Sequence, residues 1–127
     1  MNYAEMSDFE INGMIAESTQ KFGDYTKARG LTFIHEYGEP VGEFGALCLG
    51  WKEFDPCNSW ADAGPIIIEN KISLSNAIIR WDASSLVYDD KFDGGFKIYR
   101  SNSGVDSSSR GALRAAMSVF LMMREGE

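Results

Sequence analysis

The chain has 127 residues, of which 44% are hydrophobic and 24% charged, a size and balance typical of one folded domain rather than a disordered segment. Acidic residues outnumber basic ones 19 to 12, and the formal net charge of −7 disfavours direct binding to a nucleic-acid phosphate backbone. No apolar run reaches the roughly 18 residues that span a bilayer, and the acidic start MNYAEMSDFE lacks the basic and then apolar pattern of a secretory signal. We therefore expect no membrane association and a cytoplasmic location.

The first predicted element is a helix that begins after Ser7. Ser7 and Glu10 have the spacing of a capping box, and Met6 and Ile11 have the spacing of a hydrophobic staple. Helical spacing then relates Ile11, Met14, Ile15 and Ser18. This stripe predicts one face packed on the core and a helix end near residue 22 or 23.

The next segment is predicted to contain two strands joined by a turn. Residues 23–30 (GDYTKARG) are bounded by glycines and are predicted to form a turn or an exposed loop. Residues 31–37 (LTFIHEY) have the β-branched and aromatic content of a strand, and a second strand is expected near residues 46–51. Three glycines and a proline lie between them, which predicts turn structure.

A broken helix is predicted after the second strand. Asn58 suits the N-cap of a short helical turn over residues 59–63, and Pro65 then starts a second turn, PIIIEN. From Ile72 onward the pattern is extended over ISL, IIRWDAS and GFKIYR. The polar stretch at residues 101–109 (SNSGVDSSS) is predicted to be a loop.

The last predicted element is an apolar helix capped by Ser109. One stripe at helical spacing consists of Leu113, Ala116, Met117, Phe120 and Leu121. So much of the surface is apolar that we expect this helix at the centre of the core. Together the elements predict a single α+β domain over residues 1–127, in which a small antiparallel sheet packs with the N-terminal helix, the short broken central helix and the apolar C-terminal helix.

The sequence carries few groups suited to catalysis or metal binding. His35 is the single histidine and is expected to be a solvent-facing or hydrogen-bonded strand residue, while Cys48 and Cys57 are expected to be free thiols. These three residues lack the close spacings of a zinc site. In the last third, Lys91 and Arg100 stand where a calcium loop would need oxygen ligands, and no phosphate-binding glycine loop or nucleophile elbow is present. We expect no catalytic residues, no metal and no cofactor.

One group of aromatic and polar residues is the candidate ligand-binding site: Asn58, Trp60, Asp62, Arg80, Trp81 and Asp82. Two interpretations stay open. In the first, the tryptophans stack on a planar phosphorylated ligand and Arg80 meets its phosphate. In the second, Trp60 and Trp81 are core aromatics, and the polar groups are caps and surface charges. Arg110 and Arg114, one helical turn apart, form either an anion site or a solvated helix flank.

Three segments together resemble the NinX-like accessory proteins of lambda-like tailed phages. They are YAEMSDFEIN at residues 3–12, FDPCNSWADAGPIIIENKISL at 54–74 and LRAAMSVFLMM at 113–123. They cover both ends and the middle of the chain with similar order and spacing, whereas residues 23–53 and 84–109 are not matched. The resemblance implies a phage origin and an accessory role during infection, in a family of unknown function, and it implies no catalytic residues.

Two functions from different classes are consistent with these observations. The first is a non-enzymatic accessory protein that acts in host takeover or counter-defence by sequestering a small nucleotide-like host molecule at the Trp60 and Trp81 group. The alternative is an acidic protein–protein inhibitor whose charge complements a host nucleic-acid-binding or defence protein. An enzyme using carboxylates alone would need paired acids, and adjacent ones such as Asp89 and Asp90 point to opposite faces of a strand. A homo-oligomer also stays open, because the apolar last helix suits a subunit interface as well as a core.

Overall fold

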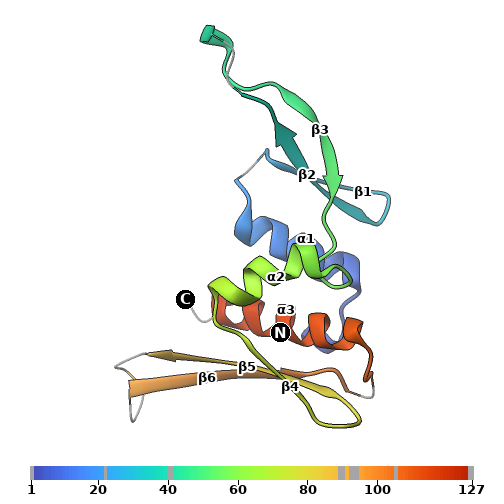
Figure 1. The fold of residues 1–127 in the computed structure, drawn as a ribbon, viewed down its shortest axis with the longest axis vertical. Helices are drawn as coiled ribbons and strands as arrows, with labels where there is room; N and C mark the ends of the chain where they lie inside the picture. The colour runs from blue at the N-terminus through green and yellow to red at the C-terminus, as the bar shows by residue number, and fades with distance from the viewer. Residues whose placement is uncertain are drawn as a thin grey trace.

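The computed structural model describes residues 2–21, 23–39, 42–88, 91, 95–104 and 106–125, which fold as two sheets with the helices between them (Figure 1). The helices are α1 (Asp8–Thr19), α2 (Trp60–Glu69) and α3 (Ser109–Glu125), with short 3₁₀ turns η1 (Tyr3–Glu5) and η2 (Gly42–Phe44). The strands are β1 (Tyr25–Ala28), β2 (Leu31–Tyr37), β3 (Cys48–Glu53), β4 (Ser73–Asn76), β5 (Trp81–Tyr88) and β6 (Phe96–Asn102). The fold is α+β, as the sequence predicts.

The strands form two separate antiparallel sheets rather than the single sheet that the sequence predicts. Their orders are β1-β2-β3 and β4-β5-β6, and α2 runs between β3 and β4, so the chain crosses the helical layer before the second sheet begins. The prediction of a loop at residues 23–30 is also wrong, because β1 pairs with β2 through a two-residue turn at Arg29 and Gly30. These two residues have φ of 54° and 76°, the positive values that such hairpin turns need.

Helix α3 lies at the centre of the hydrophobic core, as predicted. Its apolar stripe is buried throughout: Leu113, Ala116, Met117, Phe120 and Leu121. In Figure 1, α3 lies between the other helices and the second sheet. The same buried cluster includes Ile11 and Ile15 of α1, Ala63 of α2 and Ala83 of β5. One core therefore joins all three helices to the second sheet.

The capping box of α1 is confirmed. The Ser7 hydroxyl accepts a hydrogen bond from the Glu10 backbone N–H at 3.1 Å, and the Glu10 carboxylate accepts one from the Ser7 backbone N–H at 3.3 Å. The helix ends at Thr19, earlier than the predicted end near residues 22 and 23. Within the described part of the chain, no helix is both long enough and apolar enough to cross a membrane.

Helix α2 is continuous, although the sequence predicts a break at Pro65. Its N-cap is Ser59, whose hydroxyl accepts from the Asp62 backbone N–H at 3.4 Å, so the prediction of Asn58 as the cap is wrong. Pro65 cannot donate to the carbonyl of Ala61. Because both of those residues are exposed, water can satisfy this carbonyl, and the helix persists through the proline.

Three predicted boundaries shift by a few residues. The strand expected near residues 46–51 is β3, which starts and ends two residues later. Ile78 has a φ of 69° and lies in the turn before β5, where the sequence predicts strand. Helix α3 begins at Ser109, which is therefore its first residue rather than its cap. In each case the pattern identifies the element and misplaces its end, as is usual for helix and strand termini.

Candidate functional site

The hairpin of β2 and β3 projects beyond the helices at one end of the molecule (Figure 1). Strand β3 lies at the edge of its sheet, and all six of its residues are exposed. The exposed large apolar side chains of this region are Leu31, Tyr37, Leu47, Leu49 and Trp51. Soluble monomers rarely keep so many large apolar side chains together in water. The hairpin therefore has the character of a binding surface.

Aromatic rings cover the outer face of this hairpin. His35 lies opposite Trp51 in the strand register, and their rings stack with centroids 5.0 Å apart and an interplanar angle of 11°. The Phe33 ring lies 6.0 Å from the Trp51 ring. His35 Nε2 is 2.7 Å from Thr26 Oγ1, so His35 is a hydrogen-bonded strand residue, as predicted. Trp51 remains 56% exposed, and the stack presents its indole to solvent.

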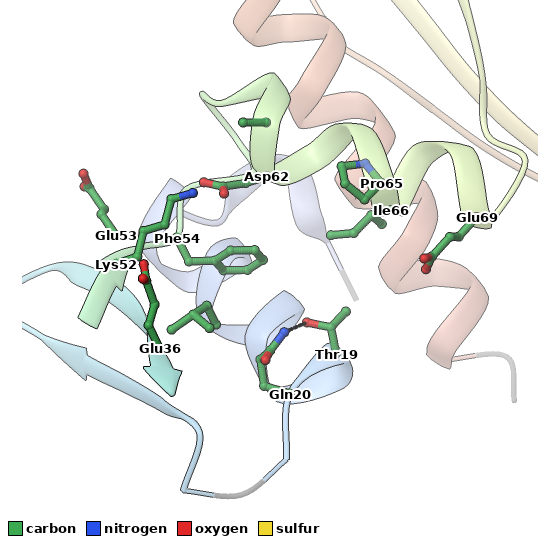
Figure 2. A pocket seen from close by; sticks show the side chains of 12 residues that line it. Thr19, Gln20, Glu36, Lys52, Glu53, Phe54, Asp62, Pro65, Ile66 and Glu69 are labelled. Carbon is green, nitrogen blue, oxygen red and sulfur yellow. Dashed lines mark hydrogen bonds between the residues drawn. The ribbon is translucent and has the colours of Figure 1, made fainter. Parts of the chain in front are cut away.

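A pocket of about 400 Å³ lies at the base of the hairpin, between its inner face and helices α1 and α2 (Figure 2). We call it the hairpin pocket. Its apolar floor consists of Ile34, Phe54 and Ile66. Phe54 and Ile66 are buried, and Ile34 lies opposite Lys52 in the register, so both strands contribute their inward-facing residues. Figure 2 shows the Phe54 ring between the hairpin and α2.

Carboxylates dominate the rim of the hairpin pocket. Four acidic residues and one basic residue line it: Glu36, Glu53, Asp62, Glu69 and Lys52. Asp62 accepts a hydrogen bond from the Asp55 backbone N–H at 2.9 Å. Among the described residues, the side chains of the three glutamates and the lysine make no hydrogen bond or ion pair, and no three His, Cys, Asp or Glu side chains converge to hold a metal ion. The charged residues of the rim therefore carry a net negative charge, which favours a cation over a phosphate.

Two predicted site residues, Asn58 and Asp62, belong to a polar network that holds the loop before α2. Buried Asn12 donates its Nδ2 to Asp55 Oδ1 at 2.8 Å and accepts from the Cys57 backbone N–H at 3.2 Å. Asn58 donates its Nδ2 to Asp55 Oδ1 at 3.0 Å, while Asp62 accepts from the Asp55 backbone. Both side chains therefore have structural partners that fix this loop against α1.

The other predicted site residues lie on different elements. Trp60 is the first residue of α2 and is 50% exposed. Trp81 is half-buried on β5, where its indole Nε1 donates to the Ser107 carbonyl at 3.0 Å. Arg80 donates its Nε to Asp82 Oδ1 at 3.1 Å, next to a groove of about 390 Å³ on the second sheet.

The structure thus divides the predicted group among separate cavities. Asp62 lines the hairpin pocket, Arg80 lines the groove on the second sheet, and Asn58 lines a cavity of about 160 Å³. Trp60 and Trp81 line none of these three cavities. No one of the three brings an indole and Arg80 together.

Arg114 is engaged by the N-terminal segment instead of being open to an anion. Its guanidinium donates to the Asp8 carboxylate and to backbone carbonyls that include Tyr3 at 2.9 Å. Cys57 lies buried nearby. Burial, and to a smaller extent the Asp8 carboxylate, raise the pKa of its thiol to about 12, while the Arg114 charge acts in the opposite direction. Both cysteines are free, as predicted. The cluster therefore ties the start of the chain to α3.

A protein-family model described as "Bacteriophage P22, NinX" matches residues 2–124. The chain belongs to this phage NinX family. The match confirms the resemblance carried by three segments and extends it through residues 23–53 and 84–109, so the hairpin is part of the NinX domain. A comparison with curated proteins finds no match.

The hairpin pocket of this NinX protein was not predicted from the sequence. The charged residues come from β2, β3 and α2, and they line one pocket because of strand register and the course of α2. A local pattern encodes neither. One partial signal was present: Glu36 follows Ile34 by two residues in the predicted strand, so a carboxylate shares the face of an inward-pointing apolar residue.

Proposed function

We propose that this NinX protein is a non-enzymatic accessory protein that binds a basic host protein in the cytoplasm of the infected bacterial cell. The observation that carries the proposal is the hairpin pocket, where unpaired carboxylates surround an apolar floor. The expected partner is a nucleic-acid-binding or defence protein, because such proteins present clusters of Lys and Arg to phosphate. Membership of a phage family supports the further proposal that the role is host takeover or counter-defence.

The pocket suits both parts of a lysine or arginine side chain. The aliphatic stem can pack on the apolar floor while the charged head meets a glutamate of the rim. The Ala61 carbonyl adds a further acceptor, since Pro65 cannot supply its helical donor and both residues line the pocket. Acceptors in excess of donors favour a cationic occupant.

The exposed apolar residues of the hairpin supply the rest of the interface. Interfaces gain most of their affinity from a few large anchors, often tryptophan, while charged groups set specificity and the rate of association. Trp51 is such an anchor, 56% exposed and stacked on His35. A complex built this way covers the basic surface that a nucleic acid would otherwise occupy, so we propose inhibition by occlusion.

Comparative capture from a host-cell extract tests the proposal. Immobilised wild-type protein is compared with the pocket variant E36Q/E53Q/E69Q and with the control E5Q/E39Q/E43Q, which removes the same charge outside the pocket. A protein counts as a partner only if it is basic, is retained by the wild type and the control, and is lost from the pocket variant. Equal retention by all three proteins contradicts the proposal.

A second candidate, sequestration of a small nucleotide-like molecule, is favoured by the groove on the second sheet. Arg80 and Arg100 both line it, together with Ser84 and Asn102. Within the described part of the chain the Arg100 side chain makes no hydrogen bond or ion pair, whereas Arg80 pairs with Asp82. The free guanidinium of Arg100 beside that of Arg80 supports binding of a phosphate here. In this form the hypothesis rests on Arg80 and not on the two tryptophans.

Native mass spectrometry tests this second candidate. A stoichiometric nucleotide-like adduct on protein purified from bacteria, absent from an R80A/R100A variant, supports it. A spectrum of unliganded protein, repeated after exposure to an extract of infected cells, contradicts it.

A further inference from the structure

The outer face of the second sheet carries an apolar patch that no described element covers. Leu86 lies opposite Ile98 and Tyr88 lies opposite Phe96 in the β5–β6 register, so the four side chains are neighbours on one face. They are 58%, 49%, 70% and 53% exposed, respectively. Figure 1 shows α3 against the other face of the sheet. We call these four residues the β5–β6 patch.

The same face continues into a polar half. On β5, Asp82 and Ser84 lie opposite Asn102 and Arg100 of β6, respectively. Each of these residues is an even number of positions from the patch residues on its own strand, so its side chain points to the same side of the sheet. The Arg100 side chain has no hydrogen bond or ion pair among the described residues. Asp82 accepts from Arg80 through Oδ1. The face therefore combines an apolar half with an unpaired cation, Arg100, and an Arg80–Asp82 pair whose Asp82 Oδ2 has no hydrogen-bond partner among the described residues.

We infer that this face binds a second copy of the chain to form a symmetric dimer. A two-fold axis running along the strands, between β5 and β6, lays β5 of each copy over β6 of the other. The register then places Leu86 over the second copy's Ile98, and Tyr88 over its Phe96. It also brings Asp82 within reach of the second copy's Arg100. The face is thus complementary to itself in apolar character and in charge.

The dimer goes beyond the proposed binding of a host protein. The hairpin lies on the opposite side of the molecule from this face (Figure 1), so the dimer keeps two hairpin pockets open to partners. Helix α3 is buried as core, and the interface is therefore assigned to the sheet. The dimer covers the groove beside Arg80, so it competes with a small ligand at that place.

The molecular mass in solution tests the dimer. Sedimentation equilibrium compares the wild type with a patch variant, L86S/I98S, and with a control, I78S/I79S, over roughly 10 to 200 µM protein. The control removes two apolar side chains that are 88% and 70% exposed in the β4–β5 turn. The wild type and the control should have about twice the 14.1 kDa of one chain. The patch variant should dissociate at least roughly 100-fold more readily and sediment as a monomer.

Three results overturn the inference: a monomeric wild type at the highest concentration, a dimer that survives L86S/I98S, or equal loss in the control. The replaced side chains are exposed in the monomer, so the variants should keep the fold, and circular dichroism with thermal unfolding checks this. The assay contains no host protein. Its failure is therefore distinguishable from failure of the proposed function.

Discussion

The N12A substitution is expected to lower the free energy of unfolding by about 2 to 4 kcal/mol. Asn12 is only 6% exposed, and its amide joins α1 to the loop before α2. It donates to the Asp55 carboxylate at 2.8 Å and accepts from the Cys57 backbone N–H at 3.2 Å. A hydrogen bond to a charged group contributes about 1.5 to 3 kcal/mol and a neutral one about 0.5 to 1.5 kcal/mol. Alanine removes both and leaves the Cys57 N–H without that acceptor.

Urea unfolding followed by tryptophan fluorescence measures this loss. With about 2.1 cal/mol/K of unfolding entropy per residue, the expected fall in Tm for 127 residues is about 7 to 15 °C. The control is N58A, which removes an exposed amide that donates to the same Asp55 carboxylate and should cost less than about 1 kcal/mol. A loss below about 0.5 kcal/mol for N12A, or equal losses for the two variants, would refute the reasoning.

Three further predictions concern helices and titrating groups. G64A should stabilise the protein by about 0.5 to 1 kcal/mol, because a Cβ at that position meets open space. G111A should destabilise it, because the added Cβ would lie 2.5 Å from a backbone carbonyl oxygen. Urea unfolding measures the sign of each change in the free energy of unfolding. Iodoacetamide should modify only Cys48 in the native protein and both cysteines after unfolding, and mass spectrometry that finds native Cys57 labelled contradicts this. Stability should decline as pH rises above about 9, since the unfolded Cys57 thiol ionises near its ordinary pKa of 9.0 while burial keeps the folded pKa at about 12. The pKa of Tyr3 is raised from 10.0 to about 12, mainly by burial, so its hydroxyl extends the decline in stability to higher pH. Unfolding curves that coincide at about pH 8 and pH 10.5 would contradict the expected contributions of Cys57 and Tyr3.

The helices could be predicted because their signals are local. The capping box at Ser7 and Glu10 specifies where α1 begins from four consecutive residues. The apolar stripe of α3 has helical spacing and is buried as that spacing requires. Pro65 misled the prediction, because its missing hydrogen bond falls on the exposed side of α2 and is tolerated there.

The sheets could be predicted only in part. Strand β2 has the predicted bounds, but β1 was missed because the Arg29-Gly30 turn lacks the usual Asn-Gly or Asp-Gly sequence. Alternation along a strand indicates which side chains point inward. It does not indicate which of two sheets the strand joins, and that depends on where α2 carries the chain.

The candidate site shows the same division between local and long-range information. Residue types alone selected Asn58 and Asp62 as ligand groups, while the structure gives both of them partners in the network around Asp55. The hairpin pocket was missed since Glu36 and Glu69 are distant in sequence and line one pocket only because of the tertiary structure. Chemistry can be inferred from composition, whereas a site also requires register and packing.

The central claim is that carboxylates of the hairpin pocket bind a basic host protein, and the dissociation constant of the captured partner tests it most directly. Each of the three glutamates should contribute about 0.5 to 1 kcal/mol, so E36Q/E53Q/E69Q should bind roughly 10- to 100-fold more weakly than the wild type. The control E5Q/E39Q/E43Q should stay within about threefold of the wild type, and the difference should shrink at about 0.5 M salt because screening shortens the reach of the charges. Equal dissociation constants for the wild type and the pocket variant at low salt would contradict the claim.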